Sequence, residues 1–232
     1  MKLITSIISA TLLVYTTGKL GNDPADSWLV YGKLPGNNSR VLSVNATWIV
    51  PSFPQNRNGN NAPGWWFGIE SQAADVLIQP ILAYGDGTPD FTIFTGLYDW
   101  RNGGWYQSNT ETVNPNDIIE GSVTYSPSTQ TYQQCIRKVN NGKGPICTRV
   151  QKSLEYNEVF TDVYFVVEHQ PNSCNENPAN GNIIFTNIQV QWENGAIVTP
   201  SMWEIKQFKP ACNSQGKVLN ASSVEFTWAT SD

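Results

Sequence analysis

Short runs of β-branched and aromatic residues recur along this chain, separated by clusters of Gly, Pro, Asn and Asp. No window keeps a helical period long enough for an amphipathic helix. The pattern therefore predicts an almost entirely β protein. The expected strands are residues 41–50, 64–69, 76–83, 91–100, 118–125, 132–137, 148–154, 163–168, 183–193, 201–208 and 224–228.

Several of these runs alternate between apolar and polar residues. In the clearest, Ile188, Val190 and Trp192 face one way, and the polar residues between them face the other. One sheet should therefore have a polar outer face. About eleven antiparallel strands favour a two-sheet β-sandwich of the jelly-roll, concanavalin-like type.

The chain has 232 residues, enough for one large all-β domain with its own core. Residues 1–18 have the layout of a secretory signal peptide, with Lys2 before an apolar stretch that is too short to span a bilayer. We expect one domain over residues 19–232, secreted to the extracellular space. No second long apolar run follows, so no membrane association is expected.

Charge further narrows the possible partners. The charged fraction is 14%, the formal net charge is −5, and the sequence pI is about 4.9. The longest basic cluster is Arg137-Lys138, so nucleic acid and anionic membranes are not expected partners. We expect a monomer.

The four cysteines are an even set that an oxidising compartment would pair in one of three ways. We favour Cys135 with Cys147, across the turn signal Asn140-Asn141-Gly142, and Cys174 with Cys212. Zinc binding is the alternative, but there is no C-x-x-C motif and only one histidine. No metal or cofactor is expected. Three sequons predict N-glycosylation, at Asn37, Asn45 and Asn220.

Two polar side chains stand inside otherwise apolar runs. Gln79 follows Val76-Leu77-Ile78, and Glu168 ends the run Phe165-Val166-Val167. A polar group buried without a partner costs about 1–3 kcal/mol, so both are candidates for chemistry. The only histidine, His169, points away from Glu168 if both are in one strand. There is no G-x-S-x-G motif, and a serine or cysteine triad is therefore not expected.

Six short segments occur in an order that resembles the glutamic peptidases of the eqolisin family. They are W-I-V-P at 48–51, W-W-F-G-I at 65–69, V-L-I-Q-P at 76–80, L-Y-D-W at 97–100, V-V-E at 166–168 and F-T-N at 185–187. The resemblance extends from about Trp28 to Trp228.

The resemblance implies a jelly-roll sandwich whose exposed sheet face is a substrate cleft for polypeptides. It carries the family's catalytic glutamine onto Gln79 and its glutamate onto Glu168. In the family's mechanism the glutamate is general base and then general acid toward a water molecule, and the glutamine amide stabilises the oxyanion. Such an endopeptidase is expected to work in acid. The substrate-binding residues would be Trp66, Glu70, Tyr98, Asp99 and Trp100.

The segment 97–102 departs from the family's W-Y-E-W-Y-P. Asp99 is one methylene shorter than the family's glutamate, and Arg101 adds a positive charge; Glu70 stands where the family has an aspartate. These changes would alter specificity or reflect lost activity. Two alternatives stay open: a non-catalytic, lectin-like carbohydrate-binding protein, and a glycoside hydrolase with a second carboxylate about 5–10 Å from Glu168.

Overall fold

A computed structural model describes residues 25–57, 63–85, 88–101, 103–150, 159–168, 173–208 and 211–232. The predicted signal peptide and His169 lie outside these residues.

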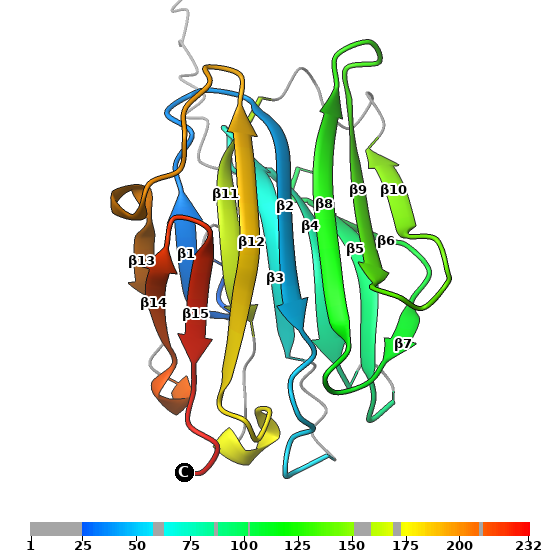
Figure 1. The fold of residues 1–232 in the computed structure, drawn as a ribbon, viewed down its shortest axis with the longest axis vertical. Helices are drawn as coiled ribbons and strands as arrows, with labels where there is room; N and C mark the ends of the chain where they lie inside the picture. The colour runs from blue at the N-terminus through cyan, green and yellow to red at the C-terminus, as the bar shows by residue number, and fades with distance from the viewer. Residues whose placement is uncertain are drawn as a thin grey trace, which may run out of the picture.

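Two antiparallel sheets lie face to face (Figure 1). The eight-stranded sheet has the order β13-β1-β11-β3-β4-β5-β6, and β7 also pairs with β5. Its strands are β1 (Trp28–Leu34), β3 (Gly64–Ser71), β4 (Val76–Tyr84), β5 (Phe91–Asp99), β6 (Gly104–Gln107), β7 (Glu111–Val113), β11 (Phe160–Glu168) and β13 (Glu204–Gln207). In Figure 1 this sheet lies behind the other.

The seven-stranded sheet has the order β10-β9-β8-β2-β12-β15-β14. Its strands are β2 (Val41–Ile49), β8 (Ile118–Ser126), β9 (Thr131–Lys138), β10 (Ile146–Val150), β12 (Asn182–Trp192), β14 (Gln215–Asn220) and β15 (Ser223–Thr227). The described helices are three 3-10 turns, η1 (Cys174–Glu176), η2 (Pro200–Met202) and η3 (Ala211–Asn213). None of these described helices has the length and apolar character needed to cross a bilayer. The prediction of an all-β, two-sheet antiparallel sandwich is confirmed.

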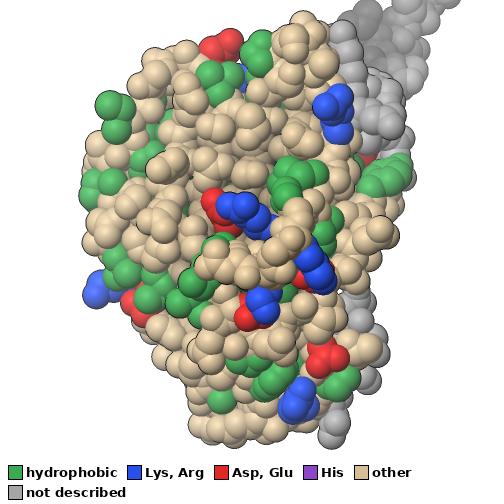
Figure 2. Space-filling view, turned by 45° about the vertical axis from the view of Figure 1, so that its right-hand side comes forward, with side chains coloured by type: hydrophobic (Ala, Val, Ile, Leu, Met, Phe, Trp, Pro, Cys, Tyr) green, Lys and Arg blue, Asp and Glu red, His purple; other side chains and the backbone are tan. Residues whose placement is uncertain are grey.

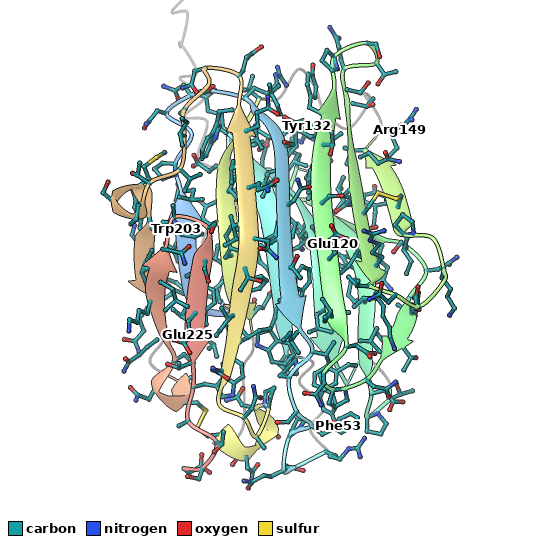
Figure 3. The ribbon with its side chains drawn as sticks, in the orientation of Figure 1. Phe53, Glu120, Tyr132, Arg149, Trp203 and Glu225 are labelled. Carbon is teal, nitrogen blue, oxygen red and sulfur yellow. A yellow bond between two sulfur atoms is a disulfide. The ribbon has the colours of Figure 1, made fainter. Side chains whose placement is uncertain are left out.

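The main core fills the space between the sheets. It includes Trp65, Phe67 and Ile69 of β3, and Phe165 and Val167 of β11. Further aromatic side chains of this core include Tyr132 on β9 and Trp203 just before β13, which are labelled in the upper part and at the left edge of Figure 3. Alternate residues of the eight-stranded sheet are therefore committed to the core, and the others face outward.

Most predicted strands have counterparts with ends shifted by a few residues. The strand predicted at 201–208 was wrong at its start, because Pro200–Met202 is a 3-10 turn and β13 begins at Glu204. Of the strand predicted at 148–154, residues 151–154 lie outside the described residues. The prediction missed β1, β6, β7 and β14.

The strand β12 contains a bulge. Asn187 has a left-handed backbone, with φ of 52°, and the register with β2 shifts between Thr186 and Gln189. Ile183 and Phe185 point into the core before the bulge, and Ile188 and Trp192 do so after it. The bulge resets the alternation, so the polar residues predicted to face outward from residue 187 onward do so.

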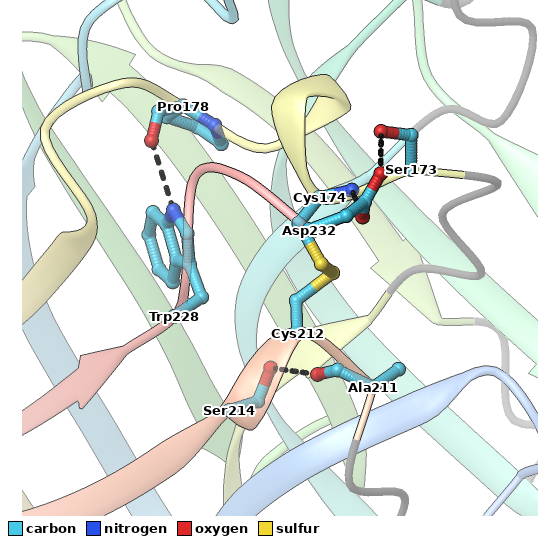
Figure 4. The surroundings of a disulfide bond; sticks show 8 residues. All are labelled: Ser173, Cys174, Pro178, Ala211, Cys212, Ser214, Trp228 and Asp232. Atoms are coloured by element: carbon cyan, nitrogen blue, oxygen red, sulfur yellow. Dashed lines mark hydrogen bonds between the residues drawn. A yellow bond between two sulfur atoms is a disulfide. The ribbon is translucent and has the colours of Figure 1, made fainter.

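Both predicted disulfides are present, Cys135–Cys147 between β9 and β10 and Cys174–Cys212 between η1 and η3. Figure 4 shows the second one beside Asp232. The Asp232 carboxylate accepts hydrogen bonds from the Cys174 backbone N–H at 2.9 Å and the Ser173 hydroxyl at 2.7 Å. These two bonds, the backbone one first, lower the pKa of Asp232 from its ordinary value.

Charged side chains are sparse on the surface around the β10 edge, and blue and red ones lie next to each other there (Figure 2). Ion pairs in this part of the molecule include Arg137 with Glu120 and Lys138 with Asp117. Most of this face is neutral and polar.

Candidate active site

The outer face of the eight-stranded sheet carries a second apolar cluster, separate from the main core. Its members are all buried; they are Trp28, Tyr31, Trp66, Leu77, Ile81, Ala83, Phe94, Tyr164 and Val166. Gln79 lies between Leu77 and Ile81 on β4, and Glu168 follows Val166 on β11. Strand alternation therefore places both polar side chains on the face of this cluster.

The Glu168 carboxylate is held by two hydrogen-bond donors. The Ser27 hydroxyl donates to Oε1 at 2.5 Å, and the Trp66 indole N–H donates to Oε2 at 2.8 Å. Trp66 is itself held edge to face against Trp28, with ring centroids 5.1 Å apart. Both carboxylate oxygens thus have fixed partners, and Glu168 remains half-buried at the end of β11.

Gln79 lies between two glycines of the neighbouring strands. It pairs with Gly96 on β5, and a Cβ added to Gly68 on β3 would lie 3.1 Å from the Gln79 Cβ. Its side chain is buried at 5% exposure, and its Oε1 has no hydrogen-bond partner among the described residues. Neither of the two register partners that flank Gln79 has a side chain of its own.

The sheet register relates the two side chains. Glu168 is opposite Gly64 on β3, whereas Gln79 neighbours Gly68 on the other side of the same strand. They are therefore offset along a diagonal, and Trp66 lies between them. On a flat sheet this offset would separate their Cα atoms by about 16 Å, and sheet twist shortens one of the two diagonals.

Asp99 was expected to bind substrate on the outer face, but its side chain points into the sandwich. It has the inward parity of Ile93 and Leu97 on β5, it is 0% exposed, and so it is not available to a substrate. Its carboxylate accepts from the Arg101 backbone N–H at 3.1 Å and from the guanidinium Nε at 2.9 Å. Arg101 also lies 3.7 Å from Asp75 in the β3–β4 turn. Asp99 and Arg101, the two departures from the family's motif, therefore form an ion pair with each other. The Arg101 charge is paired inside the fold and is not presented to the outer face.

The other predicted binding residues lie on the outer face. Glu70 is buried at 2% exposure and is opposite Asp162, whose carboxylate pairs with Lys33 at 2.6 Å. Tyr98 and Trp100 are half-buried with ring centroids 4.8 Å apart. Trp100 also packs against the second apolar cluster.

Three residues of this face were not identified from the sequence. Ser27 contacts Glu168 across 141 residues, which no local pattern could show. Trp28 begins a short apolar run that has no clean alternation and was not predicted as a strand. Trp105 on β6 is an exposed aromatic residue directly after two glycines. Within the described ranges there is no group of three His, Cys, Asp or Glu side chains that could hold a metal ion.

The fold and this face together define a class: an antiparallel β-sandwich with a hydrogen-bonded carboxylate and a side-chain amide on the outer face of one sheet. The carboxylate is suited to proton transfer, and the amide N–H to stabilising a developing negative charge. A profile of the Peptidase A4 family matches residues 32–228. The chain belongs to this family of peptidases, the glutamic peptidases or eqolisins.

Solved structures of the family share the fold. A scytalidoglutamic peptidase with a transition-state analogue inhibitor aligns with a TM-score of 0.64 at 19% identity, covering 88% of this chain and 99% of that one. SCP-B, an eqolisin in complex with the tripeptide Ala-Ile-His, aligns with a TM-score of 0.61 at 19% identity, with the same two coverages. No curated protein matches the sequence.

Proposed function

We propose that this protein is a secreted, acid-acting glutamic endopeptidase that cleaves polypeptides without a metal or cofactor. The observation that carries the proposal is the placement of Glu168 and Gln79 on one face of the sheet, on either side of Trp66. Membership of a peptidase family supports the reaction class. The two residue roles are those that the family resemblance implies, and the chemistry of a carboxylate and an amide suits them.

In the proposed reaction, the ionised Glu168 takes a proton from a water molecule, and the water oxygen attacks the carbonyl carbon of the scissile bond. The carbonyl oxygen becomes an oxyanion, which accepts a hydrogen bond from Gln79 Nε2. The protonated Glu168 then gives its proton to the amide nitrogen, the carbon–nitrogen bond breaks, and the carboxylate is regenerated. Ser27 and Trp66 would orient the carboxylate throughout.

The geometry disfavours a glycoside hydrolase that uses Glu70 or Asp162 as its second carboxylate. Asp162 is six residues before Glu168 on β11, and Glu70 is opposite Asp162. Six residues of strand extend about 20 Å, which exceeds the separation of about 5–10 Å that paired catalytic carboxylates need.

Secretion is supported by the two disulfides, because such bonds persist in oxidising compartments. The sequon asparagines occupy different settings: Asn37 and Asn220 are exposed, and Asn45 is half-buried in the middle of β2. We propose N-glycosylation at these positions and a monomeric extracellular protein.

The test is cleavage of a denatured protein substrate from about pH 2 to 7 by the wild type, Glu168→Gln and the control Glu120→Gln. Glu120 is on the outer face of the other sheet, where it pairs with Arg137 (Figure 3). Removing a general acid–base group typically lowers the rate by about 10²–10⁴-fold, so we expect that loss in Glu168→Gln and none in Glu120→Gln. A correctly folded wild type that cleaves at no pH would overturn the proposal in favour of a binding protein.

A further inference from the structure

Trp105 presents an aromatic ring to solvent on the outer face of the eight-stranded sheet, two strands away from Gln79. It lies on β6 opposite Tyr98 and is 42% exposed, whereas the apolar cluster of the same face is buried. The position matters because Gly96, two residues before Tyr98, is the register partner of Gln79 on β4. Trp105 therefore lies on the β5 side of Gln79, whereas Trp66 lies on its β3 side.

The ring lies over Gly96. A Cβ built on this glycine would overlap Trp105 Cη2 and would lie 3.0 Å from Cζ2 and 2.9 Å from Ile81 Cδ1. The tip of the indole thus reaches across β5 toward Ile81 and the strand that carries Gln79. Only a residue without a side chain at position 96 permits this placement.

Several contacts hold the ring in place although its face is open. The indole N–H donates to Gln107 Oε1 at 2.9 Å, and the ring meets Phe94 edge to face with centroids 6.5 Å apart. Beneath it, the buried Gln134 of the other sheet donates from Nε2 to the Gly96 carbonyl at 3.0 Å. An aromatic side chain that is both exposed and fixed offers apolar contact area at little cost in conformational entropy.

We propose that Trp105 is a specificity-determining residue that binds a large apolar side chain of the substrate, on the part of the peptide that approaches Gln79. This inference rests on the proposed peptidase function. Packing of one apolar side chain against such a surface discriminates by about 10–200-fold against a smaller one. The enzyme should therefore prefer large apolar residues at one position beside the cleaved bond.

The test compares the wild type, Trp105→Ala, Trp105→Phe and Gly96→Ala with the control Tyr106→Ala. Tyr106 is the next residue of β6, points the other way and is 50% exposed. Each protein digests a denatured protein mixture in acid, and mass spectrometry identifies the residues on both sides of every cleaved bond. Thermal unfolding followed by circular dichroism confirms that each variant is folded.

We expect Trp105→Ala to lose the preference for large apolar residues at one position, with kcat/KM lower by tenfold or more for such peptides and little changed for peptides with alanine there. Trp105→Phe should restore part of the preference. Gly96→Ala should reproduce the Trp105→Ala pattern, because the new methyl group displaces the ring. Preferences in Trp105→Ala that equal those of Tyr106→Ala and the wild type would overturn the inference and leave the peptidase proposal standing.

A binding measurement separates the two proposals. Calorimetry with short alanine peptides that carry one phenylalanine at each position in turn measures affinity without cleavage. If the wild type binds one such peptide tightly and cleaves nothing, a tenfold loss of affinity in Trp105→Ala supports the binding role although the peptidase proposal is wrong. If the wild type neither binds nor cleaves, both proposals are overturned.

Discussion

In both sheets, alternate residues of each strand point outward, but the two outer faces differ in the kind of side chain that they carry. The face of the seven-stranded sheet is polar in its centre, where a groove of about 450 Å³ has a lining that includes Asn45, Ser122 and Gln189. The face of the eight-stranded sheet carries a buried apolar and aromatic cluster, and Gln79 and Glu168 are polar groups in the strands that form it. On the seven-stranded sheet, each polar side chain has other polar side chains and solvent around it. On the eight-stranded sheet, Gln79 and Glu168 lie among buried apolar side chains, and a few fixed neighbours determine what each group can do.

The same contrast holds for the ion pairs. Arg137 and Glu120 on the polar face have side chains that are 49% and 40% exposed. Arg101 and Asp99, at the end of the eight-stranded sheet, are 14% and 0% exposed. An exposed ion pair adds little to the free energy of unfolding, because each charge is well solvated without its partner. Breaking a buried ion pair leaves one charge away from solvent and costs much more.

The largest expected effect on stability therefore comes from Arg101→Met. We expect a loss of about 3–5 kcal/mol in the free energy of unfolding, because the buried Asp99 carboxylate would lose the positive charge of the Arg101 guanidinium. The matched Arg137→Met should cost about 1 kcal/mol or less. Urea unfolding followed by tryptophan fluorescence measures both. Equal losses would show that the two pairs do not differ as their burial implies.

The second prediction compares two glutamines. Gln79→Ala should lower kcat for peptide cleavage by about 10²–10³-fold, because an oxyanion donor is removed. Gln191→Ala, an exposed glutamine on β12 of the polar face, should leave kcat unchanged. Steady-state kinetics in acid with both variants decides between these outcomes. A fully active Gln79→Ala would remove Gln79 from the mechanism.

A smaller effect concerns Asp232 at the Cys174–Cys212 disulfide. Because hydrogen bonds lower its folded-state pKa, its contribution to stability is present above the ordinary pKa and is lost as the pH falls through the lowered value. Asp232→Asn should therefore destabilise the protein slightly at neutral pH, and the difference from the wild type should vanish in strong acid. Thermal unfolding of both proteins across this range tests the sign. A difference that grows toward low pH would contradict it.

The sequence predicted the sandwich because alternation encodes a strand with one buried face. It failed for β1, in which Trp28 and Tyr31 join the outer cluster, Leu29 and Val30 join the core, and a register shift lies between Trp28 and Val30. A strand buried on both faces and interrupted by a bulge has no clean alternation. The short strands β6 and β14 are largely exposed and give a weak pattern.

The candidate site was accessible from the sequence only in part. Gln79 and Glu168 stand out because each interrupts an apolar run. The inward position of Asp99 could have been predicted, because it is separated by an even number of residues from Ile93 and Leu97, which point into the core. The Ser27 contact to Glu168 and the ring of Trp105 over Gly96 depend on the register between strands, which no local pattern specifies.

The central claim is that Glu168 and Gln79 act on one transition state, although the register offsets them along a diagonal. The most direct test is a double-mutant cycle in kcat/KM for a cleaved peptide, with Glu168→Gln, Gln79→Ala and the variant that carries both. Residues that act as a unit are strongly non-additive, so the double variant should be little slower than the slower single variant. Free-energy losses that add in full would show that the two residues act independently and would contradict the account.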